Sequence, residues 1–185
     1  MRRITTSALA LALLALPVVP AIAQDAKPAA ASGIRAEVQR QIDDAEKKLT
    51  ALADATPAEK FAWRPGEGVR STGEVFLHVA AANYFLPTFW GGKLPEGVDV
   101  RGLEKLGSDK AKATEELKKS FVHVRQAIDA LPDAELEKAV KVFGRDANVR
   151  EVLLLLATHA HEHTGQAIAY ARMNGITPPW SQRGE

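Results

Sequence analysis

The feature that most constrains the fold of this chain is the spacing of its apolar residues, which recur every three or four positions in several long segments. Over residues 34–53 the apolar positions alternate with charged ones in this way, at Ile34, Val38, Ile42, Ala45, Leu49 and Leu52. Positions with this spacing share one face of an α-helix. The segment therefore predicts an amphipathic helix that ends before Thr56-Pro57.

Three further helices are predicted from start and stop signals. Ser71-Thr72-Gly73-Glu74 fits a capping box, so a second helix is expected over residues 71–89, ended by Pro87 or by the Gly91-Gly92 pair. A third is expected over 108–131, before Pro132. The fourth, over 149–174, follows Asn148 as a good N-cap and ends at Asn174-Gly175, where glycine favours a left-handed stop.

The connections between these helices decide the topology. Residues Gly91–Gly107 form a linker longer than the roughly 2–8 residues usual in bundles, so it can cross one end of the bundle or run along its side. The alternation in Ala139–Gly144 fits a short extended piece, and a helical turn before it is equally compatible. No strand pattern is strong enough to build a sheet. The predicted fold class is all-α, a four-helix bundle with a long crossover connection.

The first residues have the order of a secretory signal peptide. Arg2 and Arg3 precede the apolar stretch Ala8–Val19, and the small-residue triplet Ala21-Ile22-Ala23 follows. We expect cleavage after Ala23, a flexible lead-in over residues 24–32 and one bundle domain over 33–185. An uncleaved anchor is the alternative, but the apolar stretch is interrupted by prolines and is shorter than the ~20 residues of a membrane span. The expected location is periplasmic or secreted, without a stable membrane anchor after cleavage.

Charge and cysteine content exclude several classes of function. The chain has 24 basic and 23 acidic residues, and two of the basic ones are Arg2 and Arg3, so we expect no nucleic acid as a partner. Cysteine is absent, which removes disulfides, thiolate ligands and cysteine nucleophiles. The expected partner is a small-molecule substrate. A homodimer is equally compatible with the apolar faces of a bundle.

Three histidines have the placement of a metal site. His159 and His163 are four residues apart on the fourth helix, within about 40° of each other, and therefore form a chelating pair. His161 lies about 200° around the helix from His159 and should not reach the same ion. His78 lies in the apolar run Val75–Ala82, where an unpaired imidazole is costly to bury. It is either the third ligand or a core histidine bonded to another side chain, and His123 is better read as a boundary residue.

Other polar residues share the face of this pair. Gln166 follows His159 by seven residues and is a candidate to bind a ligand, a water or a substrate, while Tyr170 continues the same stripe. Glu74 precedes His78 by one turn and is a candidate acceptor for its ring, although the capping box already explains it. Trp63 and Arg64 can cover one end of the site, but a packed loop anchor is the favoured interpretation.

Several segments together resemble a known family. They are Phe61-Ala62-Trp63-Arg64-Pro65, Gly73–Val79, Val149–Leu153, the pattern His-x-x-x-His-x-Gly-Gln over His159–Gln166, and Tyr170–Ile176. The chain looks like the DinB/YfiT-like family of metalloenzymes over essentially its whole mature part. The resemblance implies a four-helix bundle in which a divalent ion (zinc, nickel or iron) is held by His78, His159 and His163. A common family form has two adjacent histidines where this chain has Glu162-His163, a departure that keeps the ligand and alters the local charge.

The function expected from these residues is metal-dependent chemistry. Three neutral imidazoles leave an ion with open positions, as in catalytic sites, where it can activate water or polarise a substrate. Glu162, Glu74 and Tyr170 are the candidates for proton transfer, each at some distance from the ion. Relatives implied by the resemblance include thiol-dependent transferases and hydrolases, and an oxidising location disfavours thiol chemistry. We therefore expect an exported, hydrolase-like metalloenzyme. The alternatives are a non-catalytic metal- or ligand-binding bundle of the cell envelope, a thiol-dependent transferase, or a metal-free bundle.

Overall fold

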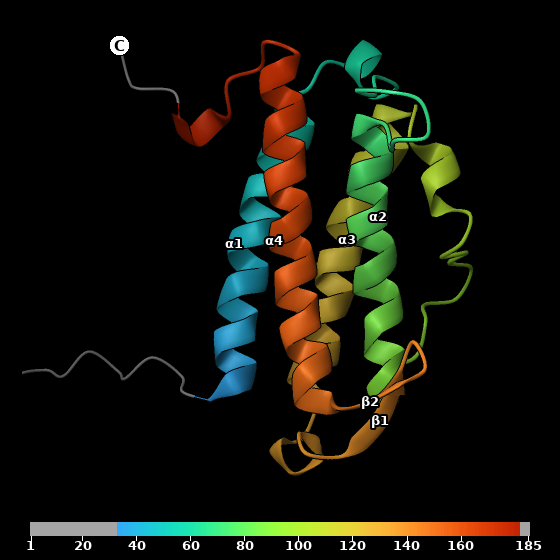
Figure 1. The fold of residues 1–185 in the computed structure, drawn as a ribbon, viewed down its shortest axis with the longest axis vertical. Coiled ribbons are helices and arrows are strands. Elements are labelled where there is room, and N and C mark those ends of the chain that lie inside the picture. The colour runs from blue at the N-terminus through green and yellow to red at the C-terminus, as the bar shows by residue number, and fades with distance from the viewer. Residues whose placement is uncertain (1–32, 182–185) are drawn as a thin grey trace, which may run out of the picture. The chain divides into compact units, whose positions relative to one another are not determined.

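The computed structural model describes residues 33–181, which form a bundle of four long helices with a small hairpin at one end (Figure 1). The helices are α1 (Ile34–Ala55), α2 (Thr72–Phe85), α3 (Lys110–Asp129) and α4 (Val149–Met173), and the hairpin strands are β1 (Ala139–Val142) and β2 (Arg145–Asn148). The predicted four-helix bundle is confirmed. The expected signal peptide and lead-in lie outside the described residues.

The order of the helices around the bundle follows from their contacts. α1 packs mainly on α3 and α4, and α2 packs on the same two helices from the opposite corner. Figure 1 shows α1 and α4 running in one direction and α2 and α3 in the other. Two helices consecutive in the chain, α2 and α3, are therefore parallel, which requires a long return connection. Residues 91–109 provide it along the side of α2, so the predicted crossover is confirmed and takes the lateral route.

The crossover is held against α2 by a close backbone approach. It contains a short 3-10 helix, η3 (Leu103–Leu106), which packs on α2. A Cβ atom added to Gly73 would lie 1.9 Å from the carbonyl oxygen of Gly107 and 2.9 Å from Cδ1 of Phe61. Only glycine fits at position 73 without a shift of backbone. This contact fixes η3 beside the first turns of α2.

Local capping explains where the helices begin and end. Ser71 Oγ accepts from the amide of Glu74 at 3.3 Å, and the Glu74 carboxylate accepts from the amide of Ser71 at 2.6 Å, so the predicted capping box is present. Asn148 caps α4, and Gly175 follows that helix with a φ of 74°. α2 ends earlier than predicted, and the chain continues as the 3-10 helix η2 (Leu86–Trp90), because Pro87 has no amide hydrogen to donate.

The segment before α4 forms the one sheet among the described residues. β1 and β2 pair antiparallel, with Ala139 opposite Asn148 and Val142 opposite Arg145, after a 3-10 turn at Asp133–Glu135. The helical turn and the extended piece considered for this stretch therefore both occur, one after the other. The expectation that no sheet forms was wrong, because this hairpin is a two-stranded sheet. Its two-residue turn, Phe143-Gly144, has φ values of 48° and 83°.

The core is formed by the predicted apolar stripes. The predicted stripe of α3 is buried and consists of Ala113, Leu117, Phe121, Val124 and Ile128. Phe61 in the loop after α1 and Phe76 in α2 are also buried, and in α1 all predicted positions except the half-buried Ile34 are buried. α2 is apolar around most of its circumference because it contacts two helices and the crossover. None of the helices within residues 33–181 is both long and apolar enough to cross a membrane.

Candidate metal centre

The structure brings together the three histidines that the sequence indicated. His78 extends from α2 toward His159 and His163 on α4, and one ring nitrogen of each lies within 4.8 Å of the others. The ring centroids are 5.0 Å apart for His78 and His159, 4.6 Å for His78 and His163, and 4.5 Å for His159 and His163. We call these three residues the histidine cluster. His163 is buried and the other two are half-buried.

The remaining histidines of the described chain do not join the cluster. His161 lies on α4 outside it, with a buried Nε2 that has no hydrogen-bond partner among residues 33–181. His123 is a half-buried residue of α3, with its ring 5.3 Å from that of Tyr84. The helical geometry therefore separates His161 from its two neighbours, as predicted.

Glu104 orients the ring of His78. The Nδ1 atom of His78 lies 2.9 Å from Oε1 of Glu104, and Arg70 Nε donates to both oxygens of the same carboxylate at 3.1 Å. A carboxylate paired with Arg70 accepts hydrogen bonds, so the hydrogen of a neutral His78 is on Nδ1. Its Nε2 lone pair then points into the cluster, 3.2 Å from Nε2 of His159.

Gln166 and Tyr170 orient the ring of His163. Oε1 of Gln166 lies 2.7 Å from Nδ1 of His163, and the amide nitrogen of Gln166 donates to the Tyr170 hydroxyl at 3.0 Å. The indole of Trp63 packs edge-on against the Tyr170 ring at 5.4 Å. The predicted ligand-binding residue and one predicted catalytic residue thus form a chain behind His163, on the side of Nδ1.

Glu162, the other predicted catalytic residue, is not brought to the cluster. Its side chain is exposed on α4 and has no hydrogen bond or ion pair within the described part of the chain. The interpretation of Arg64 as a loop anchor agrees with its contacts, since it donates to the Val69 carbonyl at 2.8 Å and to Glu74 at 3.0 Å. Glu74 is occupied by the cap and by Arg64.

Glu104 was missed by reasoning from the sequence. The expected acceptor for His78 was Glu74, one turn earlier on the same helix, whereas the observed acceptor is 26 residues later in the crossover. Periodicity along a helix carries no information about such a contact. The unusual length of the crossover was the only signal that this segment packs against the bundle.

Burial keeps two of the imidazoles neutral. Removal from water lowers the pKa of His159 to about 4, with smaller contributions from the charges of His163, His78 and Arg70. Removal from water, and then the Arg70 charge, also lower the pKa of His78, and the hydrogen bond to Glu104 opposes them in part. Neutral imidazole is the form that binds metal ions, so both rings are ready to act as ligands at neutral pH.

The donor set fits a divalent transition metal. Imidazole nitrogens suit zinc, nickel and iron, and a tetrahedral ion with bonds of about 2.0–2.1 Å separates its nitrogen ligands by roughly 3.4 Å. The distance of 3.2 Å between the Nε2 atoms of His78 and His159 is close to this value. The three rings come from two helices, and no fourth histidine or carboxylate among residues 33–181 joins the group.

An apolar cavity of about 210 Å³ lies against the cluster. His78 and His159 line it, and the other lining residues are apolar: Ala81, Ala82, Phe85, Leu86, Val100, Phe143 and Leu155. A group bound in this cavity would contact two of the three rings directly. We call it the apolar cavity.

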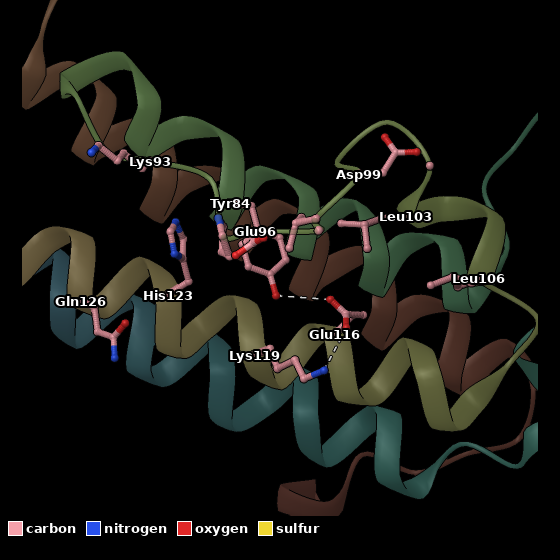
Figure 2. Close-up of a pocket in the computed structure, with 14 residues that line it drawn as sticks. Tyr84, Lys93, Glu96, Asp99, Leu103, Leu106, Glu116, Lys119, His123 and Gln126 are labelled. Atoms are coloured by element: carbon pink, nitrogen blue, oxygen red, sulfur yellow. Dashed lines mark hydrogen bonds and ion pairs between the residues drawn. The ribbon is translucent and has the colours of Figure 1, made fainter.

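A larger cavity of about 710 Å³ lies between the crossover, α2 and α3 (Figure 2). Its one histidine is His123, and its Glu116 carboxylate is engaged by Lys119 at 3.3 Å and by the Tyr84 hydroxyl at 3.4 Å. Burial and the Glu116 charge raise the pKa of Tyr84. Because the three clustered histidines lie outside this cavity, the smaller cavity beside the histidine cluster is the better candidate for chemistry.

Comparisons with known proteins agree with this architecture. The chain is similar to a DinB-like protein from Bacillus cereus ATCC 10987, with 20% identity, a TM-score of 0.58, and coverage of 77% of this chain and 93% of that one. It is also similar to a DinB-like protein from Bacillus subtilis, with 19% identity, a TM-score of 0.56, and coverage of 80% and 99%. No curated protein gives a significant match. A model of the DinB superfamily matches residues 41–167, a span that includes all three histidines of the cluster, and the chain therefore belongs to the DinB superfamily.

Proposed function

We propose that this protein is an exported metal-dependent enzyme of hydrolase type, with His78, His159 and His163 as the ligands of a divalent ion. The observation that carries the proposal is the convergence of three imidazoles from α2 and α4, with ring nitrogens within 4.8 Å of one another, beside a cavity large enough for part of a small molecule. The lowered pKa values of His78 and His159 support the same assignment.

The histidine ligands, their hydrogen-bond partners and the apolar cavity would have separate roles. A divalent ion held by three neutral imidazoles keeps its full charge and an open position, and so supplies a Lewis acid. Glu104 and Gln166 fix the rings of His78 and His163 with Nε2 toward the cluster. The apolar cavity would hold the non-reacting part of the substrate and exclude water from the histidine cluster.

The export part of the proposal rests on the amino-acid order of residues 1–23. The basic pair, the apolar stretch and the small-residue triplet are the three parts of a secretory signal. An oxidising location disfavours a low-molecular-weight thiol as co-substrate. This is why hydrolysis is preferred to thiol transfer.

A second candidate function is non-catalytic binding of a metal or ligand. It is favoured by the absence of a free general base at the cluster among the described residues. Glu104 is paired with Arg70, the Tyr170 hydroxyl accepts from Gln166, and Glu162 is exposed. In a hydrolase of this kind the ion would have to generate the nucleophile without a protein base in direct contact.

The test combines metal analysis with a substrate panel. Protein purified from its native compartment should contain one equivalent of a divalent metal, and should cleave members of a panel of esters, amides and phosphoesters until a chelator is added. His163→Ala should abolish both properties, and His161→Ala on the same helix should retain them. Stoichiometric metal without turnover would favour the binding function. Turnover only with an added thiol and an electrophile would favour a transferase, and a metal-free native protein would refute both proposals.

A further inference from the structure

Phe143 has an unusual backbone conformation for an aromatic residue. It is the one non-glycine residue with a positive φ among residues 33–181, at 48°, in the two-residue turn between β1 and β2. Asn, Asp and Gly are the residues that normally occupy such turns, because a bulky side chain is strained in the left-handed region. Phe143 as a whole residue is also 71% exposed, so burial in the core does not explain this conformation.

The Phe143 ring is nevertheless held in place by two other aromatic residues. It stacks on Phe85 of α2, with centroids 6.2 Å apart and 29° between the ring planes, and packs edge-on against Phe89 of η2 at 5.5 Å. Phe85 and Phe89 contact each other at 5.3 Å. The hairpin therefore presents this ring over the end of α2, where it lines the apolar cavity.

The dimensions and lining of the cavity define what can bind there. Its volume of about 210 Å³ exceeds the roughly 150 Å³ of an engineered apolar protein cavity that binds benzene. Apart from His78 and His159, every residue that lines it is apolar. Away from the two imidazoles, a charged or strongly polar group would lose part of its hydration there and gain no hydrogen-bond partner from the side chains.

We propose that the apolar cavity is a subsite for a compact apolar group of the substrate, and that Phe143 is a specificity-determining residue that forms its outer wall. The substrate class is a small molecule in which a group about the size of a phenyl ring or a five-carbon chain is attached to a heteroatom that a metal ion can coordinate. This inference rests on the proposed function for the position of the heteroatom. The cavity and its wall do not depend on the metal.

The first arm of the test uses zinc-loaded mature protein and alkyl hydroxamates of increasing length, from acetohydroxamate to hexanohydroxamate, with binding measured by calorimetry. Each added methylene should tighten binding about fourfold until the cavity is filled. Phe143→Asn should weaken binding of the longest probe about five- to tenfold, for a loss of roughly 50 Å² of apolar contact, and leave acetohydroxamate unchanged. Asn tolerates the left-handed region, so the hairpin should be retained.

Val122→Asn is the matched control, because Val122 is an exposed apolar residue on α3, which does not line the cavity. Affinity that does not increase with chain length, or that falls equally in both variants, would overturn the inference. The result with acetohydroxamate distinguishes failure of the apolar subsite from failure of the proposed function. If it binds no better to zinc-treated than to metal-free protein, the metal site is refuted.

The second arm decides the inference without a metal. Toluene added to the metal-free protein should shift the NMR signals of the methyl groups of Ala81, Ala82 and Leu155, which line the cavity. The shifts should be reduced in Phe143→Asn and retained in Val122→Asn. Absence of these shifts in the unmodified protein would overturn the subsite, whatever the result with zinc.

Discussion

Removal of the Glu104 carboxylate should weaken metal binding by the histidine cluster without disturbing the fold. Glu104 accepts from Nδ1 of His78 at 2.9 Å, and its second interaction is with Arg70. Through this contact it keeps Nε2 of His78 free as a ligand and stabilises the positive charge that the ring gains when it binds an ion. Loss of such an outer partner typically costs about 10- to 100-fold in metal affinity.

The solvent exposure of His78 and Glu104 determines how large the loss of zinc affinity should be. The side chains of His78 and Glu104 are 27% and 34% exposed, so water weakens the interaction and can partly replace it. A charge-assisted hydrogen bond contributes about 1.5–3 kcal/mol, and the lower half of that range applies here. Glu104→Ala should therefore raise the zinc dissociation constant about 10- to 50-fold. Glu104→Gln keeps an acceptor and loses the charge, so it should cost less than tenfold.

The assay is a competition titration with a zinc chelator at pH 7.5, together with thermal unfolding of the metal-free proteins. Glu96→Gln is the matched control, because Glu96 is an exposed residue of the same crossover that does not contact the cluster. It should bind zinc like the unmodified protein. An unchanged zinc affinity in Glu104→Ala, with normal folding, would refute the role assigned to this carboxylate.

Four further outcomes are expected. His163→Ala should lose at least 100-fold in zinc affinity and His161→Ala less than threefold, in the same titration; equal losses would contradict the assigned cluster. The metal-free protein should lose on the order of 2 kcal/mol of stability as the pH falls from 6.5 toward 4, because the unfolded chain protonates His159 in that interval and the folded one, with its pKa of about 4, does not; urea midpoints that do not change over this range would contradict the lowered pKa. Gly73→Ala should destabilise by about 2–4 kcal/mol in urea, since the crossover backbone must move, and a change below 0.5 kcal/mol would be incompatible with the close approach. N-terminal sequencing of protein isolated from its native compartment should return a sequence that begins at Gln24, and one that begins at Met1 would refute cleavage.

The long helices could be predicted from the sequence because their signals are local. The stripe of α1 and the caps at Ser71 and Asn148 depend on residues within one or two turns of each other. The pairing of His159 with His163 is local in the same sense. His78 could be added because an apolar helix gives an imidazole few other roles.

The parts that could not be predicted depend on contacts between distant segments. Glu104 reaches His78 only because the crossover folds back along α2, and Phe143 reaches the cavity only through a hairpin with strands of four residues each. The expected catalytic roles of Glu162 and Tyr170 remain predictions. One is exposed, and the other contacts the cluster only through Gln166.

The position of the histidine cluster in the chain has a consequence for folding energetics. His78 and His159 are separated by 81 residues, and an ion bound by both would close that loop. In a polymer description, closing a loop of this length lowers the conformational entropy of the unfolded chain. This raises the free energy of unfolding by about 4–5 kcal/mol, provided that both histidines stay bound to the ion in the unfolded chain. This chain has no cysteine and cannot form a disulfide. A bound metal ion would therefore act as a reversible cross-link between α2 and α4, and the stability of the fold would depend on the supply of metal.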